Sequence, residues 1–79
     1  MSPTVFLDGP YRFFFFSREE PRMHVHIHSG DGEAKFWLEP IISLANYTGL
    51  NSKQLKHIQQ LVEEHEDEIR KSWHSHFSS

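Results

Sequence analysis

The chain has no cysteine among its 79 residues, and this absence removes several classes of site. Disulfide bridges, cysteine-ligated zinc and a cysteine nucleophile are all excluded. A secreted domain of this size usually carries disulfides, so we expect an intracellular, cytoplasmic protein. The N-terminal residues show no basic segment followed by a long apolar run, so we expect no signal peptide.

Long apolar runs and a surplus of basic residues are also missing. The longest strongly apolar run covers residues 13–16 and is too short to span a membrane, so we expect no membrane partner. Eight Lys and Arg stand against eleven Asp and Glu, which gives a formal charge of −3. This balance disfavours a nucleic-acid binder that relies on a strongly basic surface, although it leaves room for a local basic patch.

The length allows one domain, which we place over residues 1–79. A chain this short buries only about 60–65% of the surface that its unfolded form exposes. Barrels of eight βα units and doubly wound nucleotide-binding folds are excluded by size. Aromatic residues make up 14% of the chain. Because each ring buries a large apolar area, we expect a folded core despite the small size.

The first part of the chain, residues 4 to about 47, predicts β-strands separated by turns. The residues from Met23 to His28 alternate strictly between His and an apolar side chain, which is the period of a strand. Residues 41–47 are compatible with either a short strand or a helical turn. The strands that we expect cover residues 4–7, 11–16, 23–28 and 33–38, with turns at 8–10 and 29–32.

Residues from about 52 to 77 contain no Gly or Pro and predict one long helix. Its apolar residues fall on one stripe with helical spacing, namely Leu55, Ile58, Val62, Ile69 and Trp73. Asn51 or Ser52 is the expected N-cap, with an incomplete capping box because neither is followed three residues later by Glu. The fold class is therefore α+β, a small antiparallel sheet of four or five strands with one C-terminal helix packed on one face.

The hairpin around residues 29–32 sorts its side chains by face if its loop holds an even number of residues. One face then collects Val25, Ile27, Ala34, Phe36 and Leu38, which we expect beneath the helix. The other face collects His24, His26 and His28 with Glu33, Lys35 and Trp37, and we expect it to stay uncovered.

The row of three imidazoles is a candidate metal site. Successive His side chains on one side of a strand lie about 6.5–7 Å apart, and neutral imidazole is the commonest protein ligand for transition metals. We therefore consider Zn, Ni or Cu bound by His24, His26, His28 and Glu33. The alternative, which we favour, is a polar, partly exposed sheet face; acid–base chemistry is a further alternative.

The aromatic strand at residues 11–16 carries rings on both sides. Tyr11, Phe13 and Phe15 point one way, whereas Phe14 and Phe16 point the other. One helix covers one sheet face, so we expect exposed rings on the second face and a homodimer or a small protein partner there. The alternative is that loops cover these rings.

Several segments together resemble the bacterial domain-of-unknown-function family four-one-six-zero (DUF4160). They are the opening Pro-Thr-Val with Tyr-Arg-Phe-Phe-Phe, His24-Val25-His26, the run from Gly32 to Pro40, Glu63-Glu64-His65 and Trp73-His74. The resemblance spans Pro3 to Phe77. It implies a small cytoplasmic prokaryotic protein, often encoded beside another small protein and associated with toxin–antitoxin pairs or transcriptional regulation. The positions it singles out are His24, His26, Lys35, Trp37, and His65 with Trp73.

The sequence thus supports a leading hypothesis and two alternatives. The leading one is an interaction module in a toxin–antitoxin-like pair, acting through the open sheet face with His24, His26, Lys35, Trp37, Phe14 and Phe16. The first alternative is a metal-dependent or acid–base enzyme, a nuclease-like toxin using His24, His26 and Glu33. The second is a nucleic-acid-binding regulator using Arg12, Arg18, Arg22 and Lys35 with the neighbouring aromatics. No nucleophile motif is present, so we lean away from an enzyme.

Overall fold

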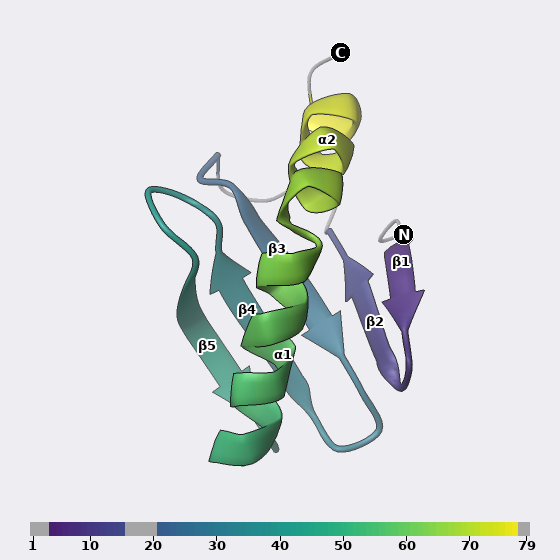
Figure 1. Ribbon diagram of the computed structural model, residues 1–79, viewed down its shortest axis with the longest axis vertical. Helices are drawn as coiled ribbons and strands as arrows, with labels where there is room; N and C mark the ends of the chain where they lie inside the picture. The colour runs from purple at the N-terminus through teal and green to yellow at the C-terminus, as the bar shows by residue number, and fades with distance from the viewer. Residues whose placement is uncertain (1–3, 16–20, 78–79) are drawn as a thin grey trace.

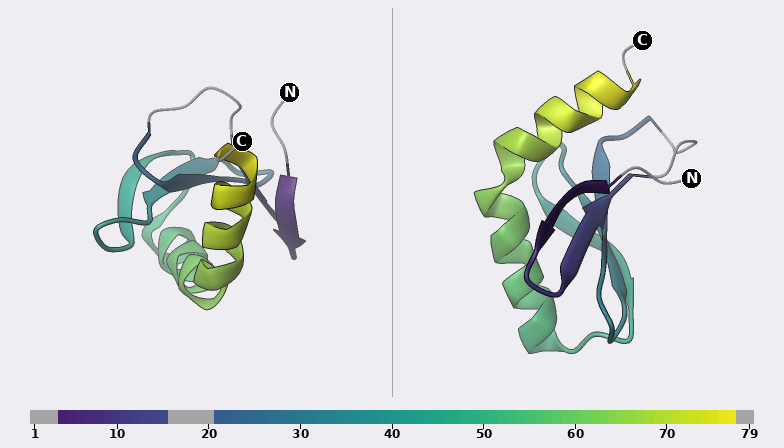
Figure 2. Two further views of the ribbon diagram at one scale, coloured as in Figure 1. Left: turned by 90° about the horizontal axis from the view of Figure 1, so that it is seen from above. Right: turned by 90° about the vertical axis from the view of Figure 1, so that its right-hand side faces the viewer.

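The structure is a computed structural model that describes residues 4–15 and 21–77, and it confirms the α+β class. Five antiparallel strands form one sheet in chain order (Figure 1). The strands are β1 (Thr4–Asp8), β2 (Tyr11–Phe14), β3 (His24–His28), β4 (Glu33–Trp37) and β5 (Ser43–Thr48). Two helices, α1 (Ser52–Glu64) and α2 (Glu66–Phe77), lie against the same face of this sheet (Figure 2).

The register between β3 and β4 is the one expected from the alternation of side chains. His24 pairs with Trp37, His26 with Lys35 and His28 with Glu33. Residues directly opposite each other share a face of the sheet, so the His row and these three partners point to the same side. The segment at residues 41–47, which from its sequence fits either a strand or a helical turn, contains most of the six-residue edge strand β5, which pairs with β4 and contains a bulge.

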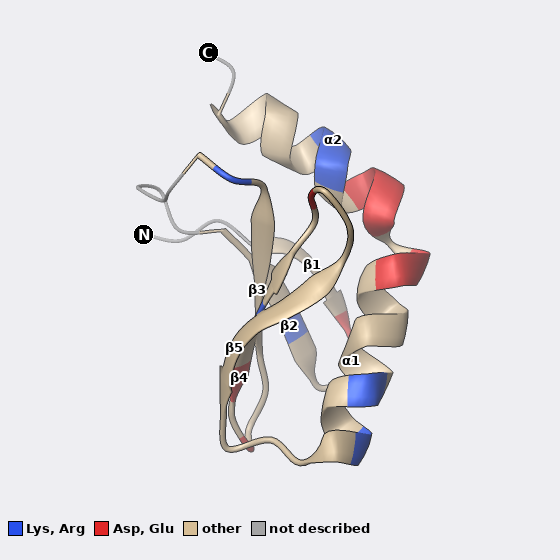
Figure 3. Cartoon of the chain, turned by 90° about the vertical axis from the view of Figure 1, so that its left-hand side faces the viewer, with Lys and Arg blue, Asp and Glu red and all other residues tan. Residues whose placement is uncertain are grey.

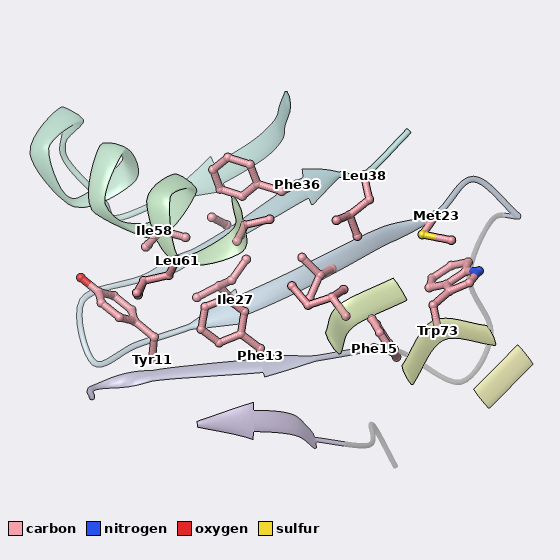
Figure 4. Close-up of a cluster of buried hydrophobic side chains, with 14 of the residues drawn as sticks. Tyr11, Phe13, Phe15, Met23, Ile27, Phe36, Leu38, Ile58, Leu61 and Trp73 are labelled. Atoms are coloured by element: carbon pink, nitrogen blue, oxygen red, sulfur yellow. The ribbon is translucent and has the colours of Figure 1, made fainter. Parts of the chain in front are cut away.

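The core lies between the sheet and the helices (Figure 4). The five apolar residues assigned to the helix-covered face are all buried. Burial of each of them except the small Ala34 contributes about 1.5–3 kcal/mol to stability. Tyr11, Phe13 and Phe15 join them, as expected from their positions on the aromatic strand. The helices supply Ile58, Leu61, Val62, Ile69 and Trp73.

The prediction of one continuous helix is wrong, because the helix breaks at His65. Its backbone, at φ −103° and ψ 16°, leaves the helical region between α1 and α2. A straight helix over residues 52–77 would measure about 39 Å, whereas strands of five residues span only about 17 Å. The bend lets α2 fold back onto the sheet, so that Ile69 and Trp73 are buried. None of the helices in the described ranges is long and apolar enough to cross a membrane.

The capping box at the start of α1 is complete, contrary to the expectation. Asn51 is the N-cap, and its Oδ1 accepts a hydrogen bond from the Gln54 backbone N–H at 2.8 Å. The Gln54 side chain accepts in return from the Asn51 backbone N–H at 2.9 Å. Glutamine serves as well as glutamate at this third position, because either side chain offers an oxygen that accepts from the N-cap amide.

Candidate functional site: the open face of the sheet

The sheet face opposite the helices, here called the open face, carries basic side chains in contact with aromatic rings. β2 contributes Arg12 and Phe14, β3 contributes His26, and β4 contributes Lys35 and Trp37. Their order follows from strand pairing, since Phe14 lies opposite His26 and His26 lies opposite Lys35. Phe14, His26 and Lys35 therefore lie in line across three strands, and Arg12 and Trp37 extend this line diagonally, each two residues along its own strand.

The β2 end of this row is a stack of one cation and two rings. The guanidinium carbon of Arg12 lies 4.6 Å from the centroid of the Phe14 ring. The Phe14 and His26 rings are stacked, with centroids 5.5 Å apart and planes 24° apart. A guanidinium within about 6 Å of a ring centroid is attracted to the negative face of the ring, so Arg12 is held over the sheet.

The β4 end carries two cations on one ring. The guanidinium carbon of Arg22 lies 4.1 Å and the Lys35 ammonium 4.4 Å from the Trp37 ring centroid. Arg22 is fixed further because its Nε donates to the backbone carbonyl of Glu39 at 2.9 Å. We refer to Arg12, Phe14, His26, Lys35, Trp37 and Arg22 together as the cation–ring row.

His24 does not lie on the open surface, contrary to the expectation for the whole His row. Its side chain is fully buried, and its Nδ1–H donates to the Arg22 carbonyl at 2.6 Å. The ring packs edge-on to Trp37 and to Trp73 of α2, with centroids 5.6 and 5.1 Å away. The helix end was expected to stay on the far side of the sheet, but β2 ends at Phe14, so Trp73 reaches the His24 ring past the end of that strand. His24 therefore supports Trp37 from below.

The expectation of an exposed Phe14 ring is also wrong. Only 5% of Phe14 is exposed, because the Arg12 guanidinium and the His26 ring cover it. Its role is to hold these two polar groups in place. Phe16 and Arg18, the other residues assigned to this region from the sequence, lie outside the described residues.

The four residues considered as metal ligands are not gathered into one group. His28 Nε2 and Glu33 Oε1 lie 3.9 Å apart at one end of the face, with both side chains more than half exposed. His24 and His26 are in ring contact at 5.2 Å, but His24 is turned into the protein. Across residues 4–15 and 21–77, no three His, Asp or Glu side chains form a cluster suited to a metal ion.

A shallow depression beside the cation–ring row extends the site toward β5. Its lining includes His26, Glu33, Lys35, Asn46 and Thr48. Asn46 pairs with Lys35 across the two strands. Asn46 was not singled out from the sequence, because its place on the open face depends on the β5 register.

His65, which the resemblance pairs with Trp73, lies far from the open face. At the junction of the helices its Nε2 is 3.0 Å from Asp8 Oδ2 and its Nδ1 is 3.3 Å from Glu68 Oε1. Burial would lower the pKa of His65, but the hydrogen bonds that it donates to Asp8 and Glu68, together with their negative charges, outweigh this effect and raise the pKa. Trp73 instead contacts Phe15 and His24, so the two residues have separate roles.

Comparison with protein-family models matches residues 11–74 to a family described as a domain of unknown function, DUF4160. The chain belongs to the DUF4160 family. The matched segment contains the complete cation–ring row as well as His65 and Trp73, so this DUF4160 protein carries its candidate site inside the family region. Neither the curated proteins nor the solved structures gave a match.

Proposed function

We propose that this DUF4160 protein is an interaction module that binds an acidic segment of a partner protein through the open face, within a toxin–antitoxin-like pair in the cytoplasm. The observation that carries the proposal is the cation–ring row, where three basic side chains are held over rings on a sheet face that neither helix covers. The lack of cysteine supports the cytoplasmic setting.

The charge of the open face favours a partner with carboxylates. Arg12, Arg22 and Lys35 bring three positive charges to the row, whereas Glu33 sits at its end beside His28. Cations already placed over rings lose little side-chain freedom when they bind a carboxylate, so less of the binding free energy is spent on ordering them. Arginine also matches the planar carboxylate with two parallel hydrogen bonds.

The same cations make single-stranded nucleic acid a weaker candidate. Proteins that bind single strands stack bases on exposed aromatic faces. Here Phe14 is almost fully buried, and Trp37 already carries Arg22 and Lys35. A base would have to displace these contacts before it could stack, whereas an acidic side chain would not.

The test is a titration of the purified chain with the protein encoded by the neighbouring gene, which is the partner that the family resemblance implies. The double variant Arg22→Glu/Lys35→Glu reverses two charges of the row. We expect it to weaken binding at least about tenfold, or 1.4 kcal/mol, and we expect wild-type affinity to fall as salt is raised. The matched control is Lys53→Glu/Lys56→Glu, which makes the same charge change on exposed positions of α1 and retains wild-type affinity.

Two results would contradict this proposal. One is equal affinity of the partner for the wild type and for the open-face variant. The other is the absence of partner binding together with salt-dependent binding of a labelled single-stranded oligonucleotide, which would assign the open face to nucleic acid instead. Circular dichroism of each variant establishes that the fold is retained before the affinities are compared.

A further inference from the structure

The strand β5 ends the sheet with an edge that no described strand pairs. It follows β4 in the sheet order, and its other side faces outward (Figure 1). Edge strands present unpaired N–H and C=O groups that pair readily with another extended chain, and proteins usually blunt such edges with charges or prolines. The chemistry of β5 therefore decides whether it is closed to other chains or available to them.

No charged residue protects β5. The twelve residues from Ile41 to Ser52 contain no Asp, Glu, Lys, Arg or His, although charged residues make up 24% of the chain. Seen from the β5 side, the strand is free of both charge colours along its length (Figure 3). The four exposed large apolar residues of the described chain are Leu7, Ile41, Leu44 and Tyr47, so three of the four belong to this one segment.

The bulge in β5 gives the edge a second property. Leu44 pairs with Phe36 and Tyr47 with Ala34, and both partners lie on the helix-covered face. Residues three apart on a regular strand point to opposite faces, but the extra residue at the bulge brings Leu44 and Tyr47 to the same face. Leu44 is 39% and Tyr47 49% exposed, so the two side chains form a small exposed apolar patch at the margin of the core.

We propose that β5 is a self-association edge, where a second copy of this chain adds its own β5 antiparallel across a two-fold axis. Full overlap of Ser43–Thr48 with its copy places the axis between Ala45 and Asn46. Leu44 then lies opposite Tyr47 of the second copy, and Tyr47 opposite Leu44. Opposed residues of an antiparallel pair share a face, so each aliphatic side chain meets a ring on the helix side of a continuous sheet.

This pairing is consistent with the electrostatics of the rest of the surface. A strand without charge meets its copy without like-charge repulsion, which two open faces with their cation–ring rows would suffer. The acidic residues near the α1–α2 junction give the helix side the same difficulty (Figure 3). The other sheet edge, β1, ends at Asp8, which is engaged by His65 of the helix junction.

One local contact must change when the second copy binds. The Tyr47 backbone N–H donates to the side-chain Oδ1 of its neighbour Asn46 at 2.8 Å. The contact is exposed, and the Asn46 side chain can turn away to water while the N–H gains a carbonyl of the second copy. The added strand therefore replaces this hydrogen bond and leaves no buried amide without an acceptor.

The experiment measures oligomeric state by sedimentation equilibrium over a range of concentrations. Wild type is expected to be dimeric, and Leu44→Lys/Tyr47→Lys, which opposes ammonium groups across the axis, is expected to weaken the dimer at least about tenfold. The control is Leu7→Lys, which places one ammonium group on a residue that is 71% exposed at the opposite edge and is expected to retain the dimer. All positions are exposed enough for the variants to fold.

Hydrogen exchange adds a measurement of the backbone itself. Amide exchange within Ser43–Thr48 is expected to slow as the wild-type concentration rises, and the β5 variant is expected to lose this dependence. A wild type that is monomeric at all concentrations would overturn the proposal. So would a dimer that survives the β5 variant but is lost in Arg22→Glu/Lys35→Glu, since that result would locate the contact on the open face.

Discussion

His65 links three parts of the chain through a single side chain. Its two ring nitrogens reach Asp8 at the end of β1 and Glu68 in the first turn of α2, and its ring packs 4.2 Å from Phe6. A neutral imidazole carries one N–H, whereas the protonated ring donates from both nitrogens. Both carboxylates can therefore accept a hydrogen bond from His65 at the same time only when the ring is protonated, which is why these contacts raise its pKa.

This arrangement predicts that stability falls as pH rises. Because folding raises the pKa of His65, its contribution is fully present below the unfolded value of 6.5 and is lost as pH increases through the raised folded value. The measurement is the urea midpoint on both sides of this window. Asp8→Asn removes the closer carboxylate and is expected to flatten this dependence, so that wild type loses more stability than the variant over the same pH rise.

The control for this prediction is Asp67→Asn, a change at an exposed carboxylate of the same turn of α2 that is not among the partners of His65. It is expected to follow the wild-type pH dependence. An Asp8→Asn variant whose urea midpoint changes with pH as steeply as that of the wild type would show that the His65–Asp8 contact does not contribute in solution.

Side-chain alternation predicted most of the open face, and it failed where the strand environment changes. Lys35 and Trp37 share a face because side chains alternate along a strand with a period of two, and His26 joins them because it pairs with Lys35. The alternation is a local pattern that can be read from the sequence. The burial of His24 depends on where β2 ends and on how far Trp73 reaches, and both are tertiary properties. Alternation also places Arg12 on the same face as Phe14, because the two residues are two apart on one strand. The contact between the guanidinium and the ring depends on the side-chain conformation, which alternation does not determine.

The break between α1 and α2 has a sequence signal that periodicity alone hides. Glu66, Asp67 and Glu68 occupy the first turn of α2, where negative charge interacts favourably with the unpaired N–H groups at a helix N-terminus. Read as part of one helix, the same residues are simply a solvent-exposed acidic stretch. The apolar stripe continues across the break, so the spacing of hydrophobic residues gave no reason to divide the helix.

The N-terminus of α1 yields a prediction about stability. Asn51→Ala removes the oxygen that accepts from the Gln54 N–H, and only the reverse bond, from the backbone N–H of residue 51 to the Gln54 side chain, can still form. We expect a loss of about 1 kcal/mol in the free energy of unfolding, the usual value for an N-cap of this type. The measurement is chemical denaturation, with Ser52→Ala at the first helical position as the control. Equal stabilities of the two variants would contradict the assignment of the cap.

The edge strand illustrates what local sequence leaves undecided. Residues 41–47 fit a strand or a helical turn equally well, because the segment is short and its alternation is interrupted at the bulge. Its pairing with β4 decides the matter, and pairing is a contact between segments. The sequence also shows that this segment has no charged residue. That absence matters for association only because the segment forms an edge of the sheet, where charges would otherwise prevent pairing with another chain.

The molecule as a whole divides its surface between two layers. The helix layer carries the acidic cluster around the α1–α2 junction, whereas the open face of the sheet carries Arg12, Arg22 and Lys35 over aromatic rings. A small negative protein with one cationic face presents that face preferentially to an acidic partner. The uncharged β5 strand forms one edge of the sheet, at the side of the molecule. A dimer formed there would leave both open faces accessible.

The most direct measurement is a hydroxyl-radical footprint of the chain alone and in complex with the protein encoded by the neighbouring gene. Trp37 and His26 report on the open face, whereas the exposed His57 of α1 and His74 of α2 report on the helix layer within the same sample. We predict that the partner lowers the oxidation of Trp37 and His26 and leaves that of His57 and His74 unchanged. Protection of the two helix residues, with Trp37 and His26 as reactive as in the free chain, would contradict it.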